Sequence, residues 1–344
     1  MKLVFAYPGN LQLRTGGYGY DRRLIAALED AGWQVERLPL GDGFPAPAAN
    51  VKRAAEQALS SLADGTLVMI DGLAFGVLDD FAAREAKRLR LVALVHHPLS
   101  LETGISATEA SRLRDSERRA LSHVRHIVVT SPETARELSA GFGVTPESIT
   151  VAVPGTDAAP AATGNARGPH ILSIGSLTAR KGHDVLISAL KMIEDRDWTA
   201  TIAGGRDLDP ATAAALERQI ADSGLAERIL LPGSVDDTGP LYAGADIFAL
   251  ASRYEGYGMV FAEALARGLP IVACRAGAVP DVVPETAGML VPVDDTAAFA
   301  DALRRLITDP QLRREKAAGA RQAGSRLPDW AETGRIVANM LETI

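Results

Sequence analysis

The chain has 344 residues, of which 47% are hydrophobic and 23% charged, and its formal net charge is −7. This balance is typical of soluble globular proteins and excludes a disordered chain, and an acidic protein without a long basic run is unsuited to nucleic-acid binding. The single cysteine, Cys274, excludes an internal disulfide, fits a reducing cytoplasm and lies in an apolar run that predicts a buried strand. We find no signal peptide and no apolar run of about 18 residues, so no membrane-spanning segment is predicted.

The chain opens with a predicted strand at residues 2–7, a glycine-rich turn at 14–21 and an amphipathic helix at 22–31. A glycine-rich turn between a first strand and a first helix has the geometry of a phosphate-binding loop, because free backbone N–H groups and the helix dipole both point at it. Gly16 and Gly17 are therefore candidate ligand-binding residues. The alternative is a flexible surface turn, since the dinucleotide fingerprint is incomplete.

Further strands are predicted at residues 34–39, 67–70, 91–96 and 126–130, with helical segments such as 51–63 and 78–88 between them. This alternation predicts a parallel sheet covered by helices on both faces. His96 and His97 follow the fourth strand, at the sheet edge where active sites form. A capping or packing role is an equally good interpretation of this pair.

A charged helical segment at residues 111–125 carries several arginines, namely Arg112, Arg114, Arg118, Arg119 and Arg125. Contact with an anionic lipid surface is one interpretation. A solvated helix face with intrahelical ion pairs is the favoured one. Glu109 and Glu117 are interpreted in the same way, as residues of a solvated face.

Residues 158–169 are rich in alanine, proline, glycine and threonine and have no periodicity, which predicts an interdomain linker. The alternation then restarts with a strand at 171–174, a helix at 185–193 and a strand at 198–203. We predict two Rossmann-like, doubly wound α/β domains with a cleft between them, at residues 1–157 and 170–326, and a last helical segment at 327–344.

Arg180 and Lys181 lie between a predicted strand end and a helix start, where two cations can neutralise a diphosphate. The alternative is a pair of exposed loop cations. Asp207 and Asp209 have the spacing of a metal-binding acidic pair. We interpret Asp209 as a helix cap before Pro210 and expect no metal.

The segment 246–273 reads as strand, loop, helix and strand, with Gly268 and Pro270 ending the helix. Glu255 lies in the loop and Glu263 in the helix, so both can contact one polar ligand over the helix N-terminus. The glycines at 256 and 258 let the backbone approach such a ligand.

The run from Glu255 through Gly256-Tyr257-Gly258 to Glu263 resembles the paired-glutamate motif of family 4 glycosyltransferases, which are retaining enzymes of the GT-B fold. The resemblance implies a nucleotide-sugar donor, with Glu255 near the sugar hydroxyls and Glu263 on the ribose. It also supports Arg180 and Lys181 as the diphosphate-binding residues, although Ser176 stands where the family commonly has arginine.

The resemblance extends to most of the chain. It implies that the last helix crosses back onto the first domain, that the loop after the strand at 229 contacts the nucleobase, and that His97, or else His96, lies near the donor sugar. The predicted catalytic residues are His97, Glu255, Arg180 and Lys181. The predicted donor-binding residues are Gly16, Gly17, Ser176, Gly204, Val235, Gly256, Tyr257, Gly258, Met259 and Glu263.

The sequence thus predicts a metal-independent retaining glycosyltransferase that needs no cofactor and uses a nucleoside-diphosphate sugar. The acceptor is an unidentified hydroxyl, with a glycan or lipid-linked glycan favoured, and the expected location is the cytoplasm, at the inner face of the membrane if the arginine-rich helix contacts lipid. Alternatives are a nucleotide-sugar epimerase of the same fold and a non-catalytic sugar-nucleotide-binding protein. A dehydrogenase ranks last because the dinucleotide fingerprint is absent.

Overall fold

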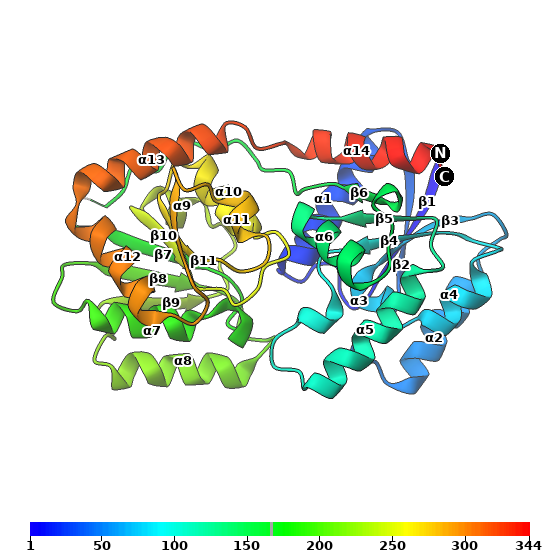
Figure 1. Ribbon diagram of the computed structural model, residues 1–344, viewed down its shortest axis with the longest axis horizontal. Helices are drawn as coiled ribbons and strands as arrows, with labels where there is room; N and C mark the ends of the chain where they lie inside the picture. Colours follow the sequence, from blue (N-terminus) through cyan, green and yellow to red (C-terminus); the bar gives the residue numbers. More distant parts are fainter. Residues whose placement is uncertain (166–167) are drawn as a thin grey trace. The chain divides into compact units, whose positions relative to one another are not determined.

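Two six-stranded parallel sheets form the framework of the computed structural model, which describes residues 1–165 and 168–344 (Figure 1). Each sheet belongs to one of two compact units. The first unit comprises Met1–Gly155 and Pro328–Ile344, and the second comprises Thr156–Leu327. Residues 166–167, in the predicted linker at 158–169, lie outside the described residues.

The sheet of the first unit has the order β2-β1-β3-β4-β5-β6, and all its pairings are parallel. Its strands are β1 (Lys2–Tyr7), β2 (Gln34–Pro39), β3 (Leu67–Asp71), β4 (Arg90–Val95), β5 (His126–Val129) and β6 (Ile149–Val151). Its helices are α1 (Gly16–Asp30), α2 (Ala49–Ser60), α3 (Gly72–Phe75), α4 (Asp79–Glu85), α5 (Ala107–Leu121), α6 (Pro132–Gly141) and α14 (Trp330–Glu342), with 3-10 turns η1 (Leu99–Leu101) and η2 (Pro146–Ser148).

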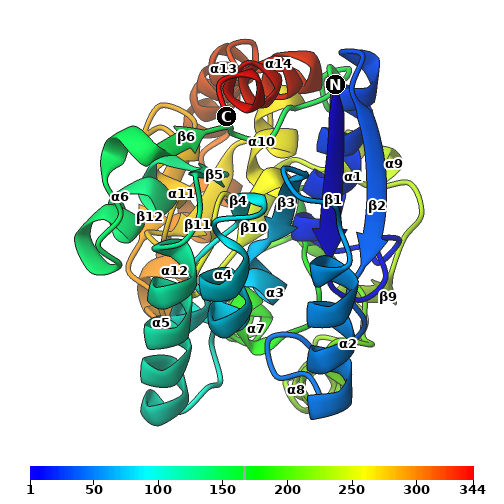
Figure 2. The same ribbon diagram turned by 90° about the vertical axis from the view of Figure 1, so that its right-hand side faces the viewer.

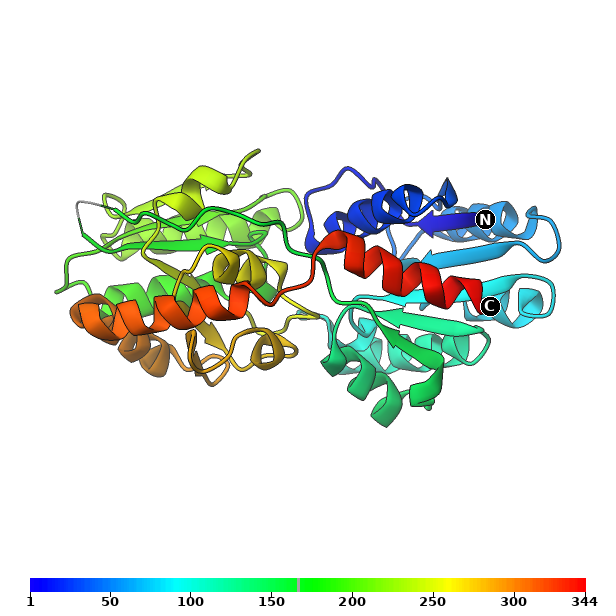
Figure 3. The same ribbon diagram turned by 90° about the horizontal axis from the view of Figure 1, so that it is seen from above.

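The central strands β3 and β4 are apolar along nearly their whole length because helices cover both faces of the sheet. Figure 2 shows α2, α4 and α5 gathered on one side of this sheet. The last helix, α14, lies beside α1, as Figure 3 shows. Gly334 on α14 allows this close packing, since a Cβ there would lie 2.6 Å from the Cβ of Ala27. The predicted return of the last helix to the first domain is confirmed.

The sheet of the second unit has the order β12-β11-β10-β7-β8-β9 and is also wholly parallel. Its strands are β7 (His170–Ile174), β8 (Thr199–Ala203), β9 (Ile229–Gly233), β10 (Ile247–Leu250), β11 (Ile271–Cys274) and β12 (Gly288–Val291). Its helices are α7 (His183–Met192), α8 (Pro210–Asp222), α9 (Gly239–Ala243), α10 (Met259–Ala266), α11 (Val279–Val282), α12 (Thr296–Thr308) and α13 (Pro310–Gly324), with the 3-10 turn η3 (Ala179–Lys181). The predicted fold class is confirmed.

Helix α1 begins earlier than predicted, at Gly16 rather than near residue 22. Thr15 caps it, because its hydroxyl accepts a hydrogen bond from the backbone N–H of Tyr18. Gly16 and Gly17 therefore form the first turn of the helix rather than a loop in front of it. Asp209 caps α8 as predicted, with its carboxylate 3.0 Å from the N–H of Thr212.

The prediction that Glu117 lies on a solvated face is wrong, because its side chain is 1% exposed and accepts a hydrogen bond from the N–H of Leu99 at 2.9 Å. Gly76 makes room for it. The side chain of Glu109 is partly exposed and pairs with Arg112, as the favoured interpretation of this helix implies. Among the described residues, no helix is both long and apolar enough to cross a lipid bilayer.

Candidate active site

Glu255 is the centre of a buried ionic cluster in the loop between β10 and α10. Its side chain is 4% exposed, although a lone carboxylate is rarely buried to this extent. Lys181 Nζ lies 2.6 Å from Glu255 Oε1, and Arg180 Nη1 lies 3.6 Å from Oε2. The hydroxyl of Ser252 donates a further hydrogen bond to Oε1 at 2.6 Å. The structure thus brings together three of the predicted catalytic residues.

These contacts decide the charge of the cluster. Burial alone would raise the pKa of Glu255, but the charges of Lys181 and Arg180 and the hydrogen bonds from Lys181 and Ser252 outweigh it, so the pKa is lowered. Glu255 is therefore ionised at neutral pH. With one anion and two cations, the cluster carries a net positive charge, which suits an anionic ligand.

The two cations come from η3, which joins β7 to α7. Gly182 ends this turn in a left-handed conformation with φ 63°, and a Cβ there would lie 2.0 Å from the carbonyl oxygen of Ala251. The turn is thus pressed against the loop that carries Glu255. Arg180 also donates to the carbonyl of Tyr254 at 3.0 Å, which fixes the guanidinium beside that loop.

Arg253 braces the same loops from outside the cluster. Its guanidinium forms a two-point pair with Asp184 at the start of α7, at 3.0 and 2.7 Å, and its Nε lies 2.8 Å from Asp294 Oδ1. Asp294 has φ 60°, a left-handed conformation that non-glycine residues rarely adopt. Three loops at the carboxyl edge of the sheet are therefore held together by one side chain.

His183 is a neutral ring that supports the loop after β7. Burial lowers its pKa to about 4. Its Nε2 lies 3.1 Å from the carbonyl oxygen of Gly175, and its Nδ1 lies 3.5 Å from the hydroxyl of Ser173. Because the carbonyl can only accept, Nε2 carries the proton. This bond fixes the backbone of the loop that contains Ser176.

The second glutamate, Glu263, lies on α10 and contacts a buried tyrosine. The hydroxyl of Tyr242 on α9 donates to Glu263 Oε2 at 2.9 Å. Burial raises the pKa of Glu263, although this hydrogen bond and the charge of Arg267 oppose the shift. Gly258, with φ 92°, precedes the first residue of the helix, Met259. The predicted donor-binding residues Gly256, Tyr257, Gly258, Met259 and Glu263 thus all lie along the start of one helix.

Gly204 follows β8 and packs against the loop after β7. A Cβ at this position would lie 1.8 Å from the carbonyl oxygen of Gly175 and 3.3 Å from the Cα of Ser176. The backbone N–H of Gly204 donates to the carbonyl of Gly233, at the end of β9. Ser176, Gly204 and Val235 therefore follow three adjacent strands, at the edge that also carries Glu255.

The remaining predicted residues belong to the first unit. Gly16 and Gly17 form the first turn of α1, and a Cβ on Gly17 would lie 3.4 Å from the imidazole of His96. His96 Nε2 lies 3.0 Å from Asp21 Oδ1, whereas His97 Nε2 lies 3.5 Å from Glu102 Oε2. The structure thus joins the glycine turn to His96, and it pairs His97 with Glu102, farther along the connection between β4 and α5.

Two family models match the chain in succession. The model described as Glycosyltransferase Family 4 matches residues 39–159, and the model described as Glycosyl transferases group 1 matches residues 168–309. The chain belongs to family 4 of the glycosyltransferases. The second model includes the whole Arg180, Lys181, Glu255 and Glu263 set.

A curated relative of this family 4 chain, D-inositol 3-phosphate glycosyltransferase of Corynebacterium diphtheriae, is 29% identical over 257 residues. These residues are 69% of this chain and 59% of the relative. The chain thus spans about three fifths of the length of the curated relatives it matches.

Solved structures share the complete fold. Sucrose-phosphate synthase from Thermosynechococcus elongatus aligns with a TM-score of 0.83 at 19% identity, covering 99% of this chain and 98% of that one. HepE from Anabaena, solved in complex with UDP-glucose, aligns with a TM-score of 0.79 at 19% identity over 100% of both chains. At this identity, the likeness establishes the GT-B fold of the family 4 chain.

One described group of side chains in the family 4 chain has the composition of a divalent-cation site. It consists of Asp21, Asp71 and His96, whose potential ligand atoms all lie within 4.8 Å of one another. The ring nitrogen that would bind a metal is instead within hydrogen-bonding reach of both carboxylates. A proton on that nitrogen accounts for the arrangement.

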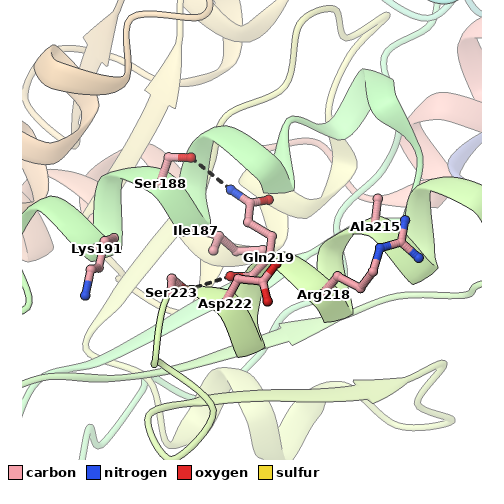
Figure 4. Close-up of a pocket in the computed structure, with 8 residues that line it drawn as sticks. All are labelled: Ile187, Ser188, Lys191, Ala215, Arg218, Gln219, Asp222 and Ser223. Carbon is pink, nitrogen blue, oxygen red and sulfur yellow. Dashed lines mark hydrogen bonds between the residues drawn. The ribbon is translucent and has the colours of Figure 1, made fainter.

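A groove of about 580 Å³ lies between α7 and α8, away from the ionic cluster. Figure 4 shows Gln219 reaching across it to the hydroxyl of Ser188, a hydrogen bond of 2.9 Å. Its lining is mixed, with Lys191, Arg218 and Asp222 beside small side chains. None of the predicted site residues lines this groove.

Sequence reasoning missed Arg253, His183, Asp184 and Tyr242 as parts of the site. One signal was available for His183, since it directly follows Lys181-Gly182 at the start of a helix. Arg253 and Tyr242 carry no such signal, because their partners are distant in the sequence.

Proposed function

We propose that this chain is a metal-independent retaining glycosyltransferase whose second unit binds a nucleoside-diphosphate sugar. The observation that carries the proposal is the buried cluster in which Glu255 faces both Lys181 and Arg180. A diphosphate can take over the two cations when it binds, because it offers them a second anion in a site from which water is largely excluded. Glu255 is then released to accept hydrogen bonds from the sugar hydroxyls.

The proposed reaction breaks the bond between the anomeric carbon and the diphosphate. Negative charge grows on the departing phosphate oxygen, and Lys181 and Arg180 stabilise it. The sugar passes through an oxocarbenium-like state, and the departing oxygen takes the proton of the acceptor hydroxyl on the same face. No nucleophilic side chain of the protein is required. The role of His97 near the donor sugar stays a prediction of the family resemblance.

We propose a glycan or lipid-linked glycan hydroxyl as the acceptor, bound by loops of the first unit. The curated relatives that act on D-inositol 3-phosphate add a small polyol phosphate as an acceptor to test. Uridine is the first base to test in the donor, because HepE was solved with UDP-glucose.

A ligand-stabilisation experiment tests donor binding. We expect UDP, GDP, ADP or CDP to raise the melting temperature of the protein, since a ligand at 100 times its Kd adds about 2.7 kcal/mol of stability. Lys181→Met is expected to abolish most of the shift, whereas Lys316→Met, on the exposed side of α13, should retain it. If none of the four diphosphates shifts the melting temperature of the wild-type chain, the proposed donor class is wrong.

Tyr242→Phe tests the assignment of Glu263 to the ribose. The substitution removes the hydroxyl that donates to Glu263 Oε2 and leaves the ring in place. We expect UDP affinity to fall by roughly tenfold or more, because a hydrogen bond to a charged group contributes about 1.5–3 kcal/mol. Inorganic pyrophosphate lacks a ribose and should bind the variant and the wild type equally. An equal loss for both ligands would show that Tyr242 supports the whole site instead.

A further inference from the structure

Two elements of the first unit direct carboxylates at the ring nitrogen of His96. His96 follows β4, Asp21 lies on α1, and Asp71 ends β3. His96 Nε2 lies 3.0 Å from Asp21 Oδ1 and 3.3 Å from Asp71 Oδ2. Asp21 is fully buried and Asp71 is 3% exposed, while the side chain of His96 is 20% exposed. Two buried carboxylates therefore share one histidine at the rim of the sheet.

The arrangement fixes the protonation of the ring. Burial lowers the pKa of His96, but the charges and hydrogen bonds of Asp21 and Asp71 outweigh it, so the pKa is raised well above its usual range. Burial and the charge of Asp71 raise the pKa of Asp21, and His96 only partly offsets them. Asp21 Oδ2 is buried and has no hydrogen-bond partner among the described side chains and backbone.

Among the described residues, two tyrosines of α1 and Asp42 are further titratable groups beside this site. The ring of Tyr20 meets the imidazole edge-on, with 5.4 Å between ring centroids. Burial and the charges of Asp71, Asp21 and Asp42 raise the pKa of Tyr18 to about 12, so this residue stays neutral. Of the described residues, His96 is the cation whose charge lowers the pKa of Asp21.

The contacts also fix which edge of the ring is available. A Cβ on Gly17 would lie 3.4 Å from Cδ2 and 3.6 Å from Nε2 of His96, so the first turn of α1 covers that edge. Nε2 is occupied by the carboxylates. Nδ1, on the opposite edge, is the N–H that remains for a ligand. His97 Nε2, by comparison, lies 3.5 Å from Glu102 Oε2, and the side chain of Glu102 is 42% exposed.

We propose that Asp21 and Asp71 are positioning residues that hold His96 as a fixed imidazolium, with Nδ1–H presented to a hydroxyl oxygen of the bound sugar. This inference rests on the proposed function and identifies His96, rather than His97, as the histidine that contacts substrate. The sugar hydroxyl can belong to the donor or to the acceptor, because both offer the same acceptor atom.

Nuclear magnetic resonance of the full chain, labelled with ¹³C and ¹⁵N at histidine, tests the ring without any substrate. The chain has six histidines, and His96→Asn assigns the signal. We expect His96 to stay protonated through pH 8 in the wild type. In Asp21→Asn it should lose its proton at a lower pH, because only Asp71 then remains beside the ring. A neutral His96 at pH 7 in the wild type, or an unchanged titration in Asp21→Asn, would overturn the proposal. So would paramagnetic broadening of the His96 signal by stoichiometric Mn²⁺, which would indicate a metal site.

Hydrolysis of UDP-glucose, with water as the acceptor, supplies the kinetic test. His96→Asn is expected to lower kcat by about 100-fold, the usual loss for a catalytic hydrogen-bond donor, and by more than His97→Asn does. Asp21→Asn should lose activity at a lower pH than the wild type does, because its imidazolium has one carboxylate fewer. A lower kcat with an unchanged KM for UDP-glucose assigns the contact to the transition state, and a raised KM assigns it to the bound donor.

The histidine titration tests the role of Asp21 and Asp71, and the hydrolysis assay tests the proposed function on which this inference rests. If no nucleotide sugar is turned over by the wild type, the proposed function fails, and the titration of His96 still decides whether Asp21 and Asp71 hold the ring. If the wild type is active and His97→Asn loses more activity than His96→Asn, the assignment of His96 is wrong. Asp71→Asn provides a second variant, because asparagine retains an oxygen that can accept from the N–H of Leu73.

Discussion

Glu255→Gln is expected to lower turnover by about two to three orders of magnitude, the usual cost of removing a group that acts in the transition state, while nucleoside diphosphates bind more tightly. Glutamine keeps the size of the side chain and can still accept from Ser252. The negative charge that faces Lys181 at 2.6 Å and Arg180 at 3.6 Å is lost. In the proposed mechanism, Glu255 of the wild type competes with the diphosphate for these cations, and the variant lacks this competition.

The affinity for UDP is therefore expected to rise in Glu255→Gln, while turnover falls. Titration calorimetry with UDP measures the first, and hydrolysis of UDP-glucose measures the second. The matched control is Glu285→Gln, which removes a carboxylate that is 87% exposed and is expected to change neither. A parallel loss of affinity and turnover in Glu255→Gln would show that Glu255 supports the shape of the site and does not compete with the ligand.

Glu255→Gln is also expected to change the stability of the folded protein. Because the folded state lowers the pKa of Glu255, its ionised form contributes stability above the unfolded pKa of about 4.3, and this contribution disappears as the pH falls through the folded value. The variant lacks this contribution and leaves two partly buried cations unopposed. We expect a lower melting temperature at pH 7 without ligand, and a larger rise on adding UDP than the wild type shows.

The sequence was sufficient for the central strands because they are apolar runs, as in β3 and β4. The strand at 247–250 was predicted with its observed ends, and so was the apolar run 271–274. The start of α1 was missed by about six residues, since two glycines argue against a helix unless a cap such as Thr15 compensates. Glu117 was misjudged because a charged helix gives no sign of which glutamate faces inward.

The candidate site likewise contains residues that the sequence predicts and residues that it does not. Glu255, Arg180 and Lys181 could be predicted because each lies where a strand ends, and a parallel sheet brings such positions to one edge. The contacts of Arg253 could not be predicted, because its partners Asp294 and Asp184 lie 41 and 69 positions away in the sequence. The preference for His96 over His97 also depends on distant partners, Asp21 and Asp71, which the sequence does not connect to either ring.

Gly204→Ala is expected to destabilise the second unit strongly, although it adds only a methyl group. The new Cβ would lie 1.8 Å from the carbonyl oxygen of Gly175, and this contact is with backbone, so no side-chain rotation can relieve it. Either β8 or the loop after β7 must move. Overpacking of this kind costs about 3 kcal/mol, and displacement of Ser176 and the following turn would disrupt the cations of the site as well.

The neighbouring glycine supplies the control. Gly205→Ala places its Cβ in open space, with no atom within 4 Å, and the residue does not have a positive φ. We expect its stability to be unchanged or slightly higher, because alanine restricts the unfolded chain more than glycine does. Thermal unfolding of both variants, with UDP binding as a second measurement, makes the comparison, and a loss of about 3 kcal/mol corresponds to roughly 6–12 °C for a unit of this size. Equal behaviour of the two variants would mean that the close contact between Gly204 and Gly175 does not shape the donor site.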